Sequence, residues 1–177
     1  MASDEVLVRE AKPEEYSVIG DLVVNAYWTL DDVGDAAYEA MLRDVASRAG
    51  TSRVLVAEVN GDLLGTVTCV GPGGDLAEVA DARAGTIRML GVSIAARGRG
   101  IGEALVRSCI SRAISDGAER IRLDTRTSMT SAQRLYERLG FERAPDHDWS
   151  PAPGILLIAY VMELPTDGLL PGDIRAP

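Results

Sequence analysis

A glycine-rich turn near the middle of the chain is the first feature that could do chemistry. Residues 89–94 have the composition of a strand, and they run into residues 97–102, which read Arg-Gly-Arg-Gly-Ile-Gly and open an amphipathic segment. Glycines let a backbone approach a ligand closely, and the free N–H groups at a helix start attract phosphate. Arg97 and Arg99 add positive charge to the same turn. The segment therefore has the chemistry of a pyrophosphate cradle, with an ordinary strand-to-helix turn as the alternative.

A second segment, residues 132–141, combines helical spacing with one hydroxyl. It reads Ala-Gln-Arg-Leu-Tyr-Glu-Arg-Leu-Gly-Phe, and Ala132, Leu135 and Leu139 recur at the period of a helix. Tyr136 lies beside them and carries a hydroxyl that packing alone does not require. Tyr136 is therefore a candidate for a chemical role, with core packing on an apolar helix face as the alternative.

Several other chemistries are disfavoured. The dinucleotide fingerprint G-x-G-x-x-G fails, because Glu103 stands where its third glycine would follow from Gly98 and Gly100. A P-loop needs a lysine after its last glycine, and the one lysine, Lys12, has no such context. The one histidine, His147, lies in a stretch rich in Pro and Asp. A histidine-based triad or zinc site is therefore not expected, and no metal is required.

The elements that must position these residues follow from periodicity and turn signals. Asn60-Gly61 lies between two β-branched runs and is the strongest hairpin signal in the chain. Strands are predicted over residues 6–9, 53–59, 63–70, 86–94 and 121–125, from 141, and over 155–164; helices are predicted over 13–26, 36–49, 101–113 and 132–139. Strands mixed with helices after an opening hairpin indicate a single α/β domain with a mixed sheet.

Both chemical segments resemble motifs of one family. Arg97-x-x-Gly100-x-Gly102 is similar to the acetyl-CoA pyrophosphate motif of the GNAT superfamily of N-acetyltransferases, Q/R-x-x-G-x-G/A, and residues 132–141 resemble that superfamily's A-x-x-L-Y-E-x-L-G-F helix. The resemblance extends over residues 6–164. It implies an α/β (α+β) GNAT-like domain over residues 1–164, with a mixed, mostly antiparallel sheet of about seven strands and helices on both faces. Residues 165–177 are expected to form an irregular tail.

The resemblance also implies where acetyl-CoA would bind. The fourth strand would splay from the fifth, and its backbone at Leu90, Gly91 and Val92 would face the pantetheine arm. Tyr136 would protonate the leaving thiolate. The pyrophosphate would lie on the backbone of the turn formed by Arg97, Gly98, Arg99, Gly100, Ile101 and Gly102.

Two positions depart from the family pattern. Met129 stands where the family often has a cofactor-binding Asn, so that contact is lost or is supplied by Ser128, Thr130 or Ser131. Gly85 and Thr86 occupy the region where many members carry a basic Glu. Asp124, at the end of the fifth strand, is therefore the candidate proton acceptor, and Glu58 and Asp81 are weaker candidates.

Composition excludes further classes. The 177 residues suffice for one domain, and a net charge of −9 with a pI near 4.6 argues against unspecific binding to nucleic acid or anionic membrane. No apolar run approaches the roughly 20 residues of a membrane helix. The first residues do not form a signal peptide, which predicts a cytoplasmic location. Cys69 and Cys109 form no paired motif and are therefore expected to be reduced and buried.

These observations predict acetyl transfer from acetyl-CoA to a primary amine of a small molecule, peptide or protein, by direct attack. A non-catalytic acyl-CoA-binding module is the main alternative, and a Rossmann-type nucleotide domain is a distant third. Residues 27–35 and 144–154 are expected to select the acceptor. The identity of the acceptor stays open, and so does whether the chain forms a homodimer. Aromatic and acidic side chains that could line its pocket are Tyr27, Trp28, Trp149, Asp31, Asp32, Asp146 and Asp148.

Overall fold

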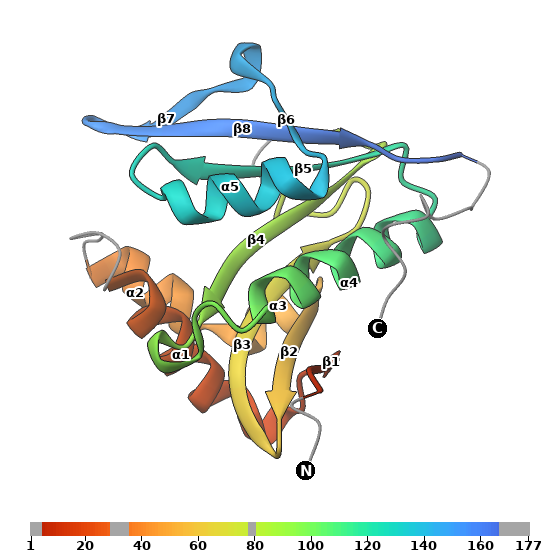
Figure 1. The fold of residues 1–177 in the computed structure, drawn as a ribbon. Coiled ribbons are helices and arrows are strands. Elements are labelled where there is room, and N and C mark those ends of the chain that lie inside the picture. Colours follow the sequence, from red (N-terminus) through yellow and green to blue (C-terminus); the bar gives the residue numbers. More distant parts are fainter. Residues whose placement is uncertain (1–4, 29–35, 78–80, 167–177) are drawn as a thin grey trace.

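A mixed eight-stranded sheet forms the centre of the molecule. The computed structural model describes residues 5–28, 36–77 and 81–166. The strands are β1 (Leu7–Glu10), β2 (Arg53–Val59), β3 (Asp62–Val70), β4 (Ala84–Val92), β5 (Arg120–Arg126), β6 (Glu142–Arg143), β7 (Trp149–Ala152) and β8 (Ile155–Glu163). Their order is β1-β2-β3-β4-β5-β8-β6, with β7 also paired to β8 (Figure 1). Among these described strands the β4–β5 pair is parallel and the others are antiparallel, which confirms the predicted mixed sheet.

Helices cover both faces of this sheet, as predicted (Figure 1). The alternation of β2 shows which helices cover which face: Val54 and Val56 pack with Ile19 and Val45 of the N-terminal helices, whereas Leu55 belongs to the core cluster under the two later helices. The helices are α1 (Tyr16–Trp28), α2 (Ala36–Arg43), α3 (Val45–Ala49), α4 (Ile101–Ser115) and α5 (Thr130–Leu139), and short 3-10 segments are η1 (Pro13–Glu15), η2 (Ile94–Ala96) and η3 (Pro145–His147).

The predicted connections are present. Asn60 and Gly61 both have positive φ, 54° and 91°, which is the backbone of a type I′ hairpin turn between β2 and β3. Helix α4 connects β4 to its parallel neighbour β5, because parallel strands require a crossover rather than a tight turn. The start of α4 therefore lies at the end of β4.

Two local predictions differ from the structure. The single helix expected over residues 36–49 is broken at Asp44, whose carboxylate accepts a hydrogen bond from Ser47 N at 3.1 Å and caps α3. Strand β7 lies in a segment for which the sequence predicts no strand. It pairs with β8 because Pro153 and Gly154, with φ of 81° at the glycine, form a turn that reverses the chain.

Two glycines bring helices unusually close to the sheet. A Cβ on Gly65 of β3 would lie 2.7 Å from Ile101 Cγ2, so the first turn of α4 rests directly on the β3 backbone. A Cβ on Gly91 of β4 would lie 3.3 Å from the Cα of Val23 in α1 on the opposite face. The end of β4 and the start of α4 are therefore held in place from both sides.

The expectation that Cys69 and Cys109 are reduced is wrong. They are buried, as predicted, but form a disulfide between β3 and α4 with a Cα–Cα distance of 5.6 Å. The two residues are 40 positions apart, and only the packing of α4 onto β3 brings them together, so sequence spacing could not show the pair. Disulfides persist mainly in oxidising compartments, which weighs against the cytoplasmic location, itself still a prediction.

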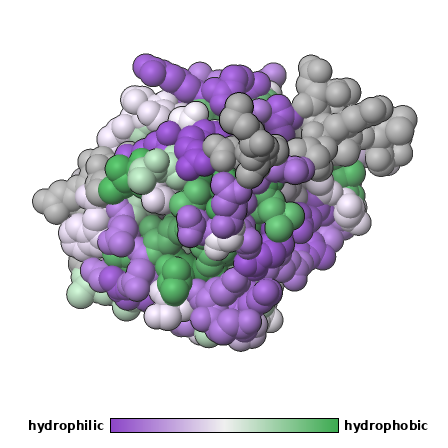
Figure 2. Space-filling model, turned by 60° about the horizontal axis from the view of Figure 1, so that its bottom comes forward, coloured by the Kyte–Doolittle hydropathy of each residue, from purple (hydrophilic) through white to green (hydrophobic). Residues whose placement is uncertain are grey.

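The surface carries some exposed hydrophobic residues. Figure 2 shows hydrophobic residues gathered in the middle of one face, with hydrophilic residues around them. Leu7, Val18 and Ile94 are among the large apolar side chains that are more than half exposed. Within the described ranges, no helix combines the length and apolar character needed to cross a bilayer. The homodimer stays a prediction.

The disulfide predicts a stability that depends on reductant. Closing a loop of 40 residues is expected to stabilise the fold by up to about 4 kcal/mol, because the cross-link restricts the unfolded chain. A reducing agent should therefore lower the denaturation midpoint of the native protein. The Cys69→Ala/Cys109→Ala variant should show no dependence on reductant. Two thiols that react with an alkylating agent in unfolded, unreduced protein would contradict the pairing.

Candidate active site

Strands β4 and β5 separate halfway along their length. Their parallel pairing runs from Ala84 and Arg120 to Ile87 and Leu123 and ends there. Beyond this point β4 carries a bulge: the pairs Thr68–Arg88 and Thr66–Gly91 leave one β3 residue opposite two residues of β4. One of the two is Met89, whose φ of 52° is uncommon for a residue with a side chain. The bulge bends β4 away from β5.

A cleft with a volume of about 120 Å³ lies between the two strands where they separate. It reaches both faces of the sheet, because its walls include α5 on one side and α1 and α2 on the other. The residues that line it come from β4 (Ile87, Arg88, Met89 and Leu90), β5 (Leu123, Asp124, Thr125 and Arg126), α5 and its cap (Met129, Ala132 and Tyr136), α1 and α2 (Tyr27 and Tyr38) and β8 (Leu157).

The β4 residues predicted to face pantetheine lie partly in this cleft. Leu90 lines it, whereas Gly91 and Val92 continue along β4 in register with Thr66 and Gly65 of β3. The opposite edge of this stretch is not paired with β5, so it can accept an extended ligand as a strand would.

The glycine-rich turn has the geometry of an anion cradle. Gly98 and Gly100 have φ of 78° and 77°, and a Cβ on either would meet no atom within 4 Å, so the backbone is open to a ligand. Helix α4 follows with 15 residues, and the N–H groups of a helix start point outward from the first turn. The turn therefore fits a pyrophosphate. The side chain of Ile101 is 1% exposed and belongs to the core, so only its backbone can face a ligand.

The two arginines of the turn differ in placement. Both are exposed, but Arg97 Nη2 donates to the carbonyl of Ala26 at 3.3 Å, which directs its side chain toward the end of α1. The cradle also adjoins α5, because a Cβ on Gly102 would lie 3.4 Å from Leu135 Cδ2 and 3.6 Å from Val92 Cγ2. Glu103 strengthens this contact by accepting from Arg138 of α5 at 2.9 Å.

Tyr136 lies between the core and the cleft. Its ring packs edge-on against Phe141 at a centroid distance of 5.9 Å and tilted against Tyr160 at 6.0 Å. No described residue hydrogen-bonds its hydroxyl, whereas the Tyr160 hydroxyl donates to Glu137 Oε1 at 2.9 Å. Burial raises the pKa of Tyr136, because the phenolate would lose its hydration. The phenol is therefore protonated at neutral pH.

Asp124 lies in the cleft wall immediately beyond the last β4–β5 pair. Its side chain is 1% exposed and accepts a hydrogen bond at Oδ1 from Arg122 Nη2 at 3.2 Å. Its second oxygen, Oδ2, is buried and has no hydrogen-bond partner among the described residues. The carboxylate is thus closed to bulk water in this conformation.

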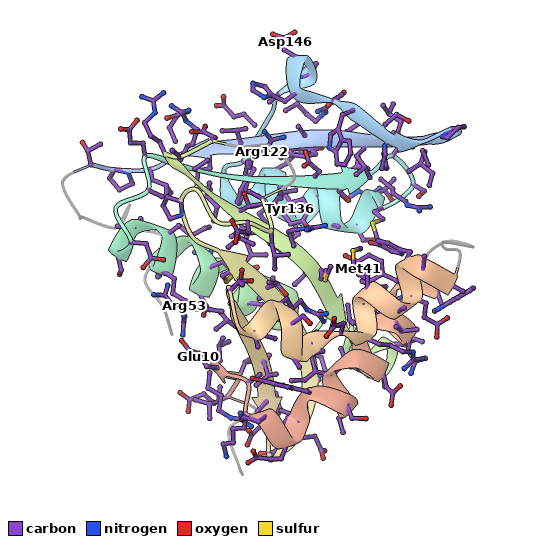
Figure 3. The ribbon with its side chains drawn as sticks, turned by 180° about the vertical axis from the view of Figure 1, so that it is seen from behind. Glu10, Met41, Arg53, Arg122, Tyr136 and Asp146 are labelled. Atoms are coloured by element: carbon purple, nitrogen blue, oxygen red, sulfur yellow. A yellow bond between two sulfur atoms is a disulfide. The ribbon has the colours of Figure 1, made fainter. Side chains whose placement is uncertain are left out.

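The weaker candidates are engaged elsewhere. Glu58 accepts from Arg9 at 2.9 Å near the far edge of the sheet, and Asp81 accepts from Arg120 at 2.9 Å. Neither lines the cleft. His147 is exposed on η3, and Asp146 of the same segment lies at the outer tip of the molecule, well away from Tyr136 (Figure 3). Within the described part of the chain, no three His, Cys, Asp or Glu side chains group as metal ligands do.

The residues expected to select the acceptor are only partly brought together. Tyr27 lines the cleft. Trp149 does not: it lies on β7 and is aligned with Leu157 of β8. Asp148 accepts a hydrogen bond from Arg143 at 2.9 Å. Trp28 is exposed, and Asp31 and Asp32 lie outside the described residues.

Sequence analysis missed four polar residues of the cleft. They are Tyr38, Arg88, Thr125 and Arg126. Arg126 could have been found, because it lies two residues after Asp124 and so shares its face of β5. Met129, the departure from the family pattern, also lines the cleft, and its sulfur accepts from Thr125 Oγ1 at 3.5 Å.

Comparison with known proteins agrees with this architecture. The fold is similar to an acetyltransferase of the GNAT family from Staphylococcus aureus, with a TM-score of 0.73 and 16% identity over 91% of this chain and 100% of that one. It is also similar to the Escherichia coli ribosomal-protein-S18-alanine N-acetyltransferase, with a TM-score of 0.67 and 16% identity over 90% and 94% of the chains. A third similar structure is a protein from Salmonella typhimurium assigned as an acetyltransferase and solved with its cofactor acetyl-CoA, with a TM-score of 0.63 and 20% identity over 90% and 94%.

These similarities show the shared fold, and the sequence itself shows the family. Residues 15–141 match the Acetyltransferase (GNAT) family, a span that includes the glycine-rich turn, both cleft strands and Tyr136. The match covers well over half of the chain and confirms the predicted resemblance, so this chain belongs to the GNAT family of acetyltransferases.

Proposed function

We propose that this protein is an N-acetyltransferase that transfers the acetyl group of acetyl-CoA to a primary amine by direct attack. The observation that carries the proposal is the cleft between the separated β4 and β5, whose walls include α5 on one face of the sheet and Tyr27 and Tyr38 on the other. Such a cleft lets a donor and an acceptor approach one another from opposite faces. The catalytic domain is taken as residues 1–164.

The donor half of the site would be formed mainly by backbone. Residues 98–102 would hold the pyrophosphate with outward-pointing N–H groups, and the free edge of β4 at residues 90–92 would bind the pantetheine arm. A backbone N–H of this stretch would also stabilise the negative charge that develops on the carbonyl oxygen during attack. Bound acetyl-CoA would supply the thioester acyl group.

Tyr136 would donate the proton that the departing thiolate needs. Its hydroxyl has no partner among the described residues, so no bond must break before donation. The raised pKa does not oppose this role, because the same dry surroundings make a thiolate more basic than it is in water. The phenol and the thiolate are thus shifted in the same direction.

Asp124 would take the proton that the amine must lose, directly or through a water molecule. It is the carboxylate nearest to the point where the strands part, and it retains one oxygen without a hydrogen bond. The acceptor is a primary amine of a small molecule, peptide or protein, and the aromatic pair Tyr27 and Tyr38, with ring centroids 6.3 Å apart, would contact its body.

A turnover screen tests the function itself. The protein is incubated with acetyl-CoA and a panel of amines, polyamines, aminoglycosides and peptides with free N-termini, and released thiol is measured. We expect amine-dependent release of CoA and an acetylated product by mass spectrometry. Binding of CoA without turnover of any amine would favour the non-catalytic acyl-CoA-binding module.

The cradle predicts that Gly100→Ala loses CoA binding. A matched control exists at Gly117, which has φ of 76° and equally open space but lies at the other end of α4. Both substitutions should cost about 1–2 kcal/mol of stability, because a side chain is strained at positive φ. Only Gly100→Ala should also lose the stabilisation by CoA in a thermal shift assay, and its affinity should fall about tenfold or more by calorimetry. Equal CoA affinities of the two variants would place the cradle elsewhere.

Tyr136→Phe should lower kcat by about 10²-fold or more and leave CoA binding intact, because it removes the proton donor and keeps the ring. Its stability should stay near that of the native protein, since the hydroxyl has no partner to lose. Tyr160→Phe is the control: it removes a hydroxyl bonded to Glu137, so it should cost about 1 kcal/mol of stability and little activity. If Tyr136→Phe keeps the native kcat when chemistry is rate-limiting, Tyr136 only packs in the core and is not the proton donor.

A further inference from the structure

A buried ion pair lies directly behind the point where β4 and β5 separate. Residues 122 and 124 share one face of β5, and the side chains of Arg122 and Asp124 are 4% and 1% exposed. Arg122 is aligned with Thr86 across the parallel pair and with Val161 of β8, so strands flank it on both sides. Figure 3 shows Arg122 beside β5, in a view from the opposite side to Figure 1.

The pair is incompletely satisfied. Arg122 Nε, Asp124 Oδ2 and Thr86 Oγ1 are all buried without a hydrogen-bond partner among the described residues. Native proteins rarely leave buried polar atoms unpaired, and where they do the atoms often belong to a functional site. Of the three residues, Asp124 lines the cleft, and Arg122 and Thr86 are aligned across the parallel strand pair.

A buried carboxylate loses its hydration, so its charge in a dry site has to be compensated by a cation or by hydrogen bonds. Among the described residues, Arg122 donates the one hydrogen bond that this carboxylate accepts, from Nη2 to Oδ1. The other charged or titratable side chains around the cleft are Arg88 of β4, Arg126 of β5, Tyr27 of α1, Tyr38 of α2 and Tyr136 of α5. Of these, Arg88 donates to the carbonyl of Leu76 at 2.9 Å.

We infer that Arg122 is a positioning residue for the amine-proton acceptor. Its guanidinium holds Oδ1 of Asp124, keeps the carboxyl ionised, and leaves Oδ2 as the oxygen that takes the proton. When the ammonium form of the acceptor loses its proton, an N–H bond breaks, the proton passes to Oδ2 directly or through a water, and the electron pair stays on nitrogen. That pair forms the new C–N bond to the acetyl carbonyl carbon, the C–S bond breaks, and the departing thiolate takes the proton of Tyr136. The inference rests on the proposed function, since it assigns Arg122 to the same reaction.

Infrared spectroscopy of aspartate-labelled protein tests the charge without any acceptor. Near neutral pH, Arg122→Met should show the carbonyl band of a protonated carboxyl group, and this band should vanish in Arg122→Met/Asp124→Asn. Arg122→Lys, which keeps a cation, should not show it. Absence of the band from folded Arg122→Met would overturn the inference.

Kinetics with acetyl-CoA and an amine that turns over in the screen test the positioning role. Arg122→Met should lose kcat about as far as Asp124→Asn, on the order of 10²-fold, with KM for acetyl-CoA nearly unchanged, and Arg122→Lys should recover most of it. Arg48→Met is the matched control. Arg48 is equally buried at 4% and also has an unpartnered Nε, but its Nη1 donates to the carbonyl of Met41, whereas Arg122 donates to Asp124. This variant should lose stability and keep kcat.

The outcomes separate the two proposals. If Asp124→Asn is impaired and Arg122→Met behaves like Arg48→Met, the role of Arg122 is wrong and the proposed function stands. If Asp124→Asn keeps native kcat, the assignment of the proton acceptor in the proposed function is wrong. If no amine of the panel turns over, the proposed function fails, and the infrared measurement still decides whether Arg122 keeps Asp124 ionised.

Discussion

The architecture depends on one constraint: β4 and β5 pair as parallel strands over four residues each and then part. The pairing up to Ile87 and Leu123 holds the two halves of the sheet together, and the bulge at Met89 ends it. A residue with a side chain at positive φ costs about 1–2 kcal/mol, so the surrounding structure must over-determine it. Gly91 supplies part of that support, because the absent side chain lets α1 press against β4 just beyond the bulge.

The same constraint places the glycine-rich turn. Helix α4 must cross from β4 to β5, so it begins where β4 ends and lies against the opposite face from α1. Its first turn rests on Gly65, its middle is tied to β3 by the Cys69–Cys109 disulfide, and Glu103 joins it to Arg138 of α5. These contacts hold the backbone N–H groups of the turn beyond the end of β4, where exposed arginines add positive charge in an otherwise acidic protein.

The two walls of the cleft each bury one proposed reactive group, Tyr136 or Asp124, and the surroundings of the two groups differ. On the α5 side, Tyr136 is neutral when protonated, so burial costs little and keeps the proton on the phenol. On the opposite side, the Asp124 carboxylate is buried beside a cation, and Arg122 Nη2 lies within hydrogen-bond distance of its Oδ1. The proposed donor and the proposed acceptor of protons are thus kept apart by the strands between which the reaction would occur.

Much of this arrangement could be predicted from the sequence because it is local. The Asn60-Gly61 hairpin, the helix opened by residues 97–102, the helix carrying Tyr136 and the mixed sheet all follow from turn chemistry and periodicity, and the two motifs identify the family. The disulfide, the β4 bulge and the Arg122–Asp124 pair could not be predicted. Cys69 and Cys109 meet only because α4 packs on β3. The bulge at Met89 depends on the pairing of β4 with β3 and on the packing of α1 against β4. Arg122 and Asp124 alternate with apolar residues, as residues on the surface side of a strand would. The tertiary structure covers that face of β5 and so makes them a buried pair. Burial could not be predicted, because it depends on what packs above a strand and not on the strand itself.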